Sequence, residues 1–94
     1  MSHTLEERRV ASDLVAGLYQ IEAFFPTLPA TVNEITTQLE NLDPIKQGVM
    51  NAETKQHIID CFRMAEGYHL LSHGHGFENI EAMRRDMARI AGTR

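Results

Sequence analysis

The spacing of apolar residues constrains the fold of this chain more than any other feature of its sequence. Between residues 4 and 25 they recur at every third or fourth position, at Val10, Leu14, Leu18, Ile21 and Phe25. This period matches one face of an α-helix. Thr4 and Glu7 form a capping-box pattern at the start, and Pro26 ends the pattern because a residue before proline avoids helical dihedral angles. The sequence therefore predicts an amphipathic helix over about 4–25.

Three further segments repeat the helical period. Over about 28–42 the apolar residues step by four, three, four and three and form a narrow seam of two heptads: Leu28, Val32, Ile35, Leu39 and Leu42. This second helix is predicted to begin at Thr27 or Leu28, with Pro29 in its first turn, and to fold back on the first because the connection is short. Two more helices are predicted, over about 52–73 with Asn51 as N-cap, and over about 77–91.

The rest of the chain shows no strand signal and no internal repeat. Asp43 and Pro44 are typical of an N-cap followed by a first-turn proline, which predicts a short helical turn at 44–50. We therefore expect an all-α fold, a small antiparallel bundle of four helices that forms a single domain over residues 1–94. A chain of this size can form one core without a metal or a disulfide.

The composition predicts a globular cytoplasmic protein. The chain has 94 residues, of which 43% are hydrophobic and 23% charged, and a single cysteine, Cys61. No apolar run approaches the ~20 residues that a membrane-spanning helix needs, and the N-terminus lacks the pattern of a signal peptide. A lone cysteine excludes an internal disulfide and suits the reducing cytosol. We expect no membrane association and no cofactor.

Charge is unevenly distributed along the sequence. The net charge is -4, and no lysine or arginine lies between Val10 and Ile45. Residues 1–43 carry seven acidic side chains and two basic ones, whereas residues 44–94 carry six acidic and seven basic ones. A net negative charge argues against direct nucleic-acid binding, which needs a basic footprint. An acidic first half suits a protein partner with a basic surface, although chance also produces such differences.

Three of the five histidines cluster where the third predicted helix must end: His69, His73 and His75. On a helix, the first two share one face, so that together the three could bind zinc, nickel or copper through ring nitrogens. Leu70 stands where a His-Glu-x-x-His metalloprotease has its glutamate. The simpler interpretation is a helix end, with histidines favourable near the negative end of the dipole and Gly74 or Gly76 as the left-handed capping residue.

Two other groups of side chains could carry chemistry. His57 and Cys61 lie one helical turn apart, but Cys61 falls on an apolar stripe, where burial raises the pKa of a thiol and leaves it unreactive. Arg84, Arg85 and Arg89 could bind an anion, a nucleotide ligand or an acidic surface. No glycine-rich phosphate loop accompanies these arginines, and a solvated helix face is the alternative. We expect no catalytic residues, and hence no enzyme.

The apolar connection between the first two helices suggests an interface. Phe24, Phe25 and Leu28 either close the core or form an exposed patch that binds a partner. The narrow seam of the second helix predicts a homodimer, in which a second copy covers that seam. Glu34 and Glu40 would then face a basic partner surface.

The function expected from these features is non-enzymatic binding of another protein. Such a protein would act as an adaptor, regulator or inhibitor, in the manner of antitoxins and of phage inhibitors, which include small acidic helical proteins. The alternatives are a metal-binding module that uses the histidine cluster and a binder of anions or nucleotides that uses the three arginines.

Overall fold

Four α-helices make up the part of the chain that the computed structural model describes, which is residues 3–25, 27–29, 31–42, 50–71 and 80–92. The helices are α1 (Leu5–Ile21), α2 (Val32–Asn41), α4 (Ala52–Gly67) and α5 (Ile80–Ala91). No strand occurs in these ranges, so the all-α prediction is confirmed. The turn predicted at 44–50 lies outside the described residues apart from Met50, which is not helical. None of the described helices is long and apolar enough to cross a bilayer.

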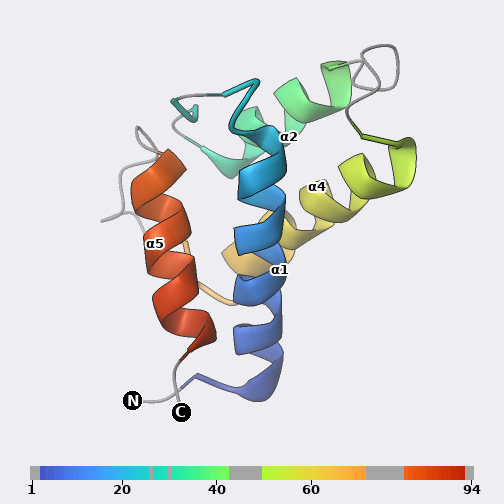
Figure 1. Cartoon of the computed structure of the whole chain (residues 1–94). Helices are drawn as coiled ribbons and strands as arrows, with labels where there is room; N and C mark the ends of the chain where they lie inside the picture. The colour runs from blue at the N-terminus through green and yellow to red at the C-terminus, as the bar shows by residue number, and fades with distance from the viewer. Residues whose placement is uncertain (1–2, 26, 30, 43–49, 72–79, 93–94) are drawn as a thin grey trace.

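Helix α1 lies at the centre of the arrangement (Figure 1). Helix α5 runs antiparallel beside it, and α4 crosses it obliquely. Helix α2 packs on α4 and lies across the end of α1 near Ile21, so it does not fold back along α1 as predicted. The reason is that α4 provides the apolar surface that α2 covers. The bundle therefore consists of two antiparallel pairs that cross each other, α1 with α5 and α2 with α4.

Side-chain caps set the starts of three helices. In each, the oxygen of the N-cap side chain accepts the amide of the third residue along, at 2.7 to 3.1 Å, and the caps are Thr4, Thr31 and Asn51. The predicted caps of α1 and α4 are confirmed, whereas α2 begins later than predicted, with Thr31 as its N-cap, whose hydroxyl accepts the amide of Glu34. The carboxylate of Glu7 bonds His3 Nδ1 at 2.9 Å. This hydrogen bond lowers the pKa of Glu7, and smaller contributions come from hydrogen bonds with the side chain and the backbone of Thr4, as expected of a capping box.

Helix α4 ends six residues before the predicted boundary, because a Schellman motif closes it at Gly67. The amide of His69 donates to Glu66 O at 3.0 Å, and that of Leu70 donates to Ala65 O at 2.9 Å. His69 takes the left-handed position, with φ 60, that was predicted for Gly74 or Gly76. Leu70 is buried, so its packing turns the chain off the helix axis. His69 therefore lies beyond the end of α4, and His73, predicted to share a helix face with it, lies outside the described residues.

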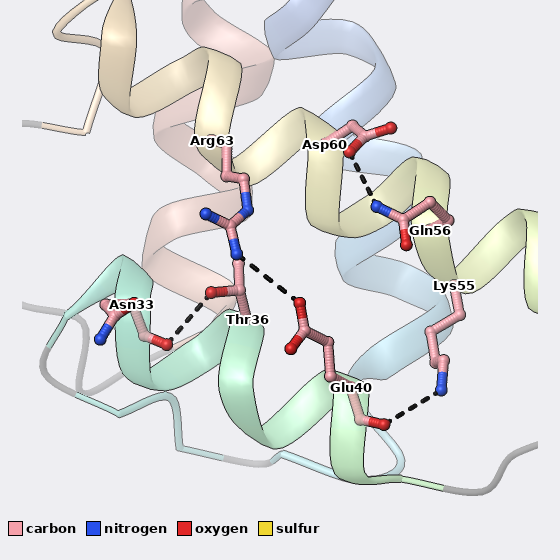
Figure 2. Close-up of polar contacts among 7 residues, drawn as sticks. All are labelled: Asn33, Thr36, Glu40, Lys55, Gln56, Asp60 and Arg63. Atoms are coloured by element: carbon pink, nitrogen blue, oxygen red, sulfur yellow. Dashed lines mark hydrogen bonds and ion pairs between the residues drawn. The ribbon is translucent and has the colours of Figure 1, made fainter.

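One apolar core joins all four helices. Its largest fully buried members are Phe62, Leu14, Leu18, Ile21, Ile35, Leu39, Ile58, Ile59, Met83 and Met87. Thr36 is buried among them, and its hydroxyl donates to the carbonyl of Asn33 at 3.1 Å (Figure 2). The seam of α2 is buried in the single chain through Leu28, Val32, Ile35 and Leu39. That seam therefore needs no second copy of the protein to cover it.

Candidate functional site

A close approach of α1 and α4 builds the candidate site. At Gly17 of α1, a Cβ atom would lie 3.1 Å from Ile58 Cγ1 of α4, closer than most Cβ atoms in proteins approach a neighbour. Glycine permits this approach because it presents only a hydrogen to the facing helix. Asp13 lies one turn before Gly17, and His57 directly precedes Ile58. The crossing thus brings Asp13 and His57 together, although 44 positions separate them in the sequence.

Three potential metal ligands meet at this crossing: Asp13, His57 and Cys61. One ligand atom from each lies within 4.8 Å of the others. His57 Nε2 is 3.9 Å from Asp13 Oδ2 and 3.6 Å from Cys61 Sγ. The side chains of His57 and Asp13 are 61% and 45% exposed, whereas Cys61 is only 3% exposed. Solvent therefore reaches the imidazole and the carboxylate, and the sulfur forms the floor beneath them.

The thiol of Cys61 is held in its protonated form. Burial raises its pKa to about 11, and the negative charges of Asp13 and Asp60 add to the shift. A protonated thiol is a poorer nucleophile than a thiolate. The prediction of a buried thiol with a raised pKa is confirmed.

An open groove of about 320 Å³ adjoins the cluster along the α1/α4 crossing. Besides Asp13 and His57, the polar side chains that line it are Gln20, Glu53 and Thr54. Carboxylate and amide oxygens are donors for a cation or for a small polar ligand. Of this site, the sequence indicated only that His57 and Cys61 lie one helical turn apart. Asp13 was not predicted, because its approach depends on the crossing at Gly17.

The histidine cluster that the sequence suggested is placed only at His69. This residue is exposed and lies beyond the end of α4. His73 and His75 lie outside the described residues. Helix α4, which ends at Gly67, does not include His69, and metal binding at His69, His73 and His75 stays a prediction.

The three arginines of α5 each face a carboxylate of the same chain. Arg84 bonds Glu22 at 2.7 Å and stacks over the ring of Tyr19, with its guanidinium carbon 4.2 Å from the centroid. The other two pairs are Arg85 with Glu81 at 3.8 Å and Arg89 with Asp86 at 3.6 Å. These pairs reduce the positive field that an external anion would meet. Binding of an anion or nucleotide at this face stays a prediction.

The residues predicted to bind a partner divide into buried and exposed ones. Phe25 and Leu28 are buried and Phe24 is half-buried, so the apolar connection closes the core. Glu34 and Glu40 are exposed on α2. Their exposure leaves α2 with an acidic outer surface.

Basic side chains of α4 lie along the edge of α2 (Figure 2). Arg63 Nη2 is 3.6 Å from Glu40 Oε1. Lys55 Nζ bonds the carbonyls of Glu40 and Leu42 at 3.3 and 3.1 Å, which satisfies groups at the end of α2. Contacts with basic side chains of α4 therefore offset part of the negative charge of the first half of the chain.

Comparison with protein-family models, with curated proteins and with solved structures gives no match.

Proposed function

We propose that this protein acts by binding other proteins and not by catalysis, as a helical adaptor, regulator or inhibitor that assembles as a homodimer. The observation that carries the proposal is an exposed tyrosine stacked against an arginine on the α1/α5 face. Tyr19 is 59% exposed there, with Arg84 over its ring. The protonated thiol of Cys61 and the open shape of the neighbouring groove favour a non-enzymatic role.

The α1/α5 face has the residue types that dominate protein interfaces. Tyr19 lies beneath Arg84, and Glu22 fixes Arg84 through a short ion pair. Tyrosine and arginine are enriched among the residues that contribute most to binding. A side chain held in place before association loses less conformational entropy on binding. A shallow groove with Val15, Glu81, Arg85 and Ala88 in its lining continues this surface.

The charges on this face suit a second copy of the same chain. Glu81 and Arg85 lie one turn apart on α5, and both are exposed. A two-fold axis between antiparallel copies of α5 places Arg85 of each copy opposite Glu81 of the other. A two-fold interface repeats each contact, so a single complementary pair counts twice. Tyr19 would lie beside these contacts and lose its exposure to water.

In such a dimer, α2 would provide the surface that binds the partner. It carries exposed Glu34 and Glu40, which suit a protein with a basic surface. The single thiol, Cys61, suits a cytoplasmic location within this proposal.

The test is the oligomeric state, measured by sedimentation equilibrium and by native mass spectrometry over micromolar concentrations. We expect a dimer that Tyr19→Ala weakens at least about tenfold, the loss of roughly 1.4 kcal/mol. Arg85→Glu should weaken it as well, and adding Glu81→Arg in the same chain should restore it. Tyr68→Ala is the matched control, because Tyr68 is an exposed tyrosine at the end of α4. A strictly monomeric wild type at high micromolar concentration would overturn the proposal.

A further inference from the structure

We propose that Asp13, His57 and Cys61 form a binding site for a divalent transition-metal ion, with zinc as the ion that fits best. The protein would supply three ligands, the Asp13 carboxylate, His57 Nε2 and the Cys61 sulfur. The fourth position would face the α1/α4 groove, open to water or to a ligand. The site lies away from the α1/α5 face, so it does not depend on the proposed dimer.

The distance between the sulfur and nitrogen ligand atoms matches that of a tetrahedral zinc site. With bonds of about 2.3 Å to sulfur and about 2.0 Å to nitrogen, tetrahedral zinc holds these two atoms roughly 3.6 Å apart. Cys61 Sγ and His57 Nε2 are 3.6 Å apart. A carboxylate oxygen and a nitrogen on the same ion would be about 3.3 Å apart. Asp13 Oδ2 is 3.9 Å from His57 Nε2, and its half-exposed carboxylate can close that gap by rotating.

The chemistry of the donors restricts the choice of ion. One thiolate, one imidazole and one carboxylate are the three ligand types that zinc accepts together. Calcium and magnesium prefer sites made of oxygen atoms alone, so Cys61 argues against them. Because α4 contributes His57 and Cys61 and α1 contributes Asp13, two packed helices hold the ligands. Ligands on helices are positioned more accurately than ligands on loops.

The adjoining groove is a separate feature that points to a ligand. It opens beside Asp13 and His57 and places Glu53 and Gln20 in its lining. Either side chain could accept a hydrogen bond from water or from a small molecule held in the groove. A site with three protein ligands and one open position is the arrangement that zinc adopts when it also binds a small molecule.

Binding would be coupled to release of a proton. The Cys61 S–H bond breaks, its proton passes to solvent, and the sulfur forms the bond to the metal as a thiolate. His57 binds as neutral imidazole through Nε2 and gives up its contact with the thiol. Negative charges on Asp13 from α1, and on Asp60 from α4 itself, favour the thiol in the free protein and favour the cation once it is bound. Affinity should therefore rise about tenfold per pH unit between pH 7 and pH 9, since one proton leaves per ion.

The experiment is a titration of the untagged, chelator-treated protein with cobalt(II) and zinc(II). Cobalt bound to the Cys61 thiolate should give a sulfur-to-metal charge-transfer band in the near ultraviolet at one ion per chain. Cys61→Ala should abolish this band. Asp13→Asn and His57→Gln should weaken binding at least about tenfold. Zinc should raise the melting temperature and protect Cys61 from iodoacetamide in the wild type, which tests the site without any substitution.

His69→Asn is the matched control. Asparagine tolerates the left-handed conformation that His69 adopts, so this variant should keep the fold and bind metal like the wild type. Tyr19→Ala should also leave metal binding unchanged while it weakens the dimer, which separates the two proposals. Absence of the charge-transfer band and of zinc stabilisation in the wild type would overturn the proposal. Loss of binding in His69→Asn, with binding retained in His57→Gln, would overturn it in favour of the histidines at 69–75.

Discussion

Helix α1 packs against α5 and α4 in two different ways. Along α5 the two helices lie side by side and antiparallel, and their rim carries Tyr19, Arg84 and Glu22 in an aromatic and ionic contact. At α4 the helices cross, with Gly17 against Ile58 at the point of contact.

The difference shows how packing determines the chemistry of each rim. A long antiparallel contact brings many side chains together, and the charged ones at its edge find opposite charges. A crossing at glycine brings two backbones close over a short length, so short polar side chains from both helices can meet. The edge of the α1/α5 contact is therefore suited to binding another protein, and the edge of the α1/α4 crossing to binding an ion.

Among the substitutions that test the two contacts of α1, truncation of Ile58 should change the free energy of unfolding most. Ile58→Ala removes a buried side chain at the crossing and should lower the free energy of unfolding by about 2–5 kcal/mol. Met87→Ala, on the α5 side, should cost a similar amount but leave the α1/α4 groove intact. Urea denaturation measures both. A loss below about 1 kcal/mol for Ile58→Ala would show that the crossing is not tightly packed.

The reactivity of Cys61 should differ strongly between the folded and unfolded protein. Its pKa is raised from 9.0 to about 11, so the thiolate fraction at pH 8 is about a hundredfold lower than for an ordinary cysteine. Alkylation by iodoacetamide in the presence of a chelator should be slow in the folded protein and fast in urea. Equal rates in both states would contradict a buried, protonated thiol.

The same shift predicts how stability depends on pH. The folded state prefers the neutral thiol more than the unfolded state does. The contribution of Cys61 to stability is therefore complete below pH 9 and is lost as the pH rises through about 11. Urea midpoints between pH 8 and pH 11 should fall more steeply for the wild type than for Cys61→Ala.

Two glycine-to-alanine substitutions should change stability in opposite directions. Gly17→Ala places a Cβ against buried Ile58 and should cost about 1 kcal/mol despite the higher helix propensity of alanine. Gly67→Ala meets no atom within 4 Å and should stabilise α4 by up to about 1 kcal/mol. In the Ile58→Ala background the cost at Gly17 should disappear, which a double-mutant cycle measures. Stabilisation by Gly17→Ala alone would mean that the two helices can separate at no cost.

The smallest effect should come from the ion pair on the α1/α5 rim. Arg84 is mostly covered but Glu22 is about half exposed, so solvent screens their attraction. A cycle of Glu22→Gln and Arg84→Gln should give a coupling of about 0.2–1 kcal/mol that falls with added salt. A coupling that salt does not alter would indicate that the pair is shielded from water.

Local signals explain why much of the fold was predicted. The helical periods predicted four helices, and the capping residues Thr4 and Asn51 were correct because a cap depends only on neighbouring residues. The predictions that were wrong concern features that depend on contacts between residues far apart in the sequence. Leu70 is buried, and α4 ends before it. Helix α2 packs on α4 and not along α1, and the length of the connection between α1 and α2 does not predict this.

The amino-acid sequence by itself determined the helices, their apolar faces and the burial of Cys61, since periodicity and local hydrogen bonds act over a few residues. The tertiary structure alone decided which helices cross, and hence which polar side chains meet. Asp13 reaches His57 and Cys61 only because Gly17 lets α1 approach α4, and Tyr19 meets Arg84 only because α5 lies along α1. Such contacts depend on the three-dimensional path of the chain, and the spacing of residues along the sequence does not predict them.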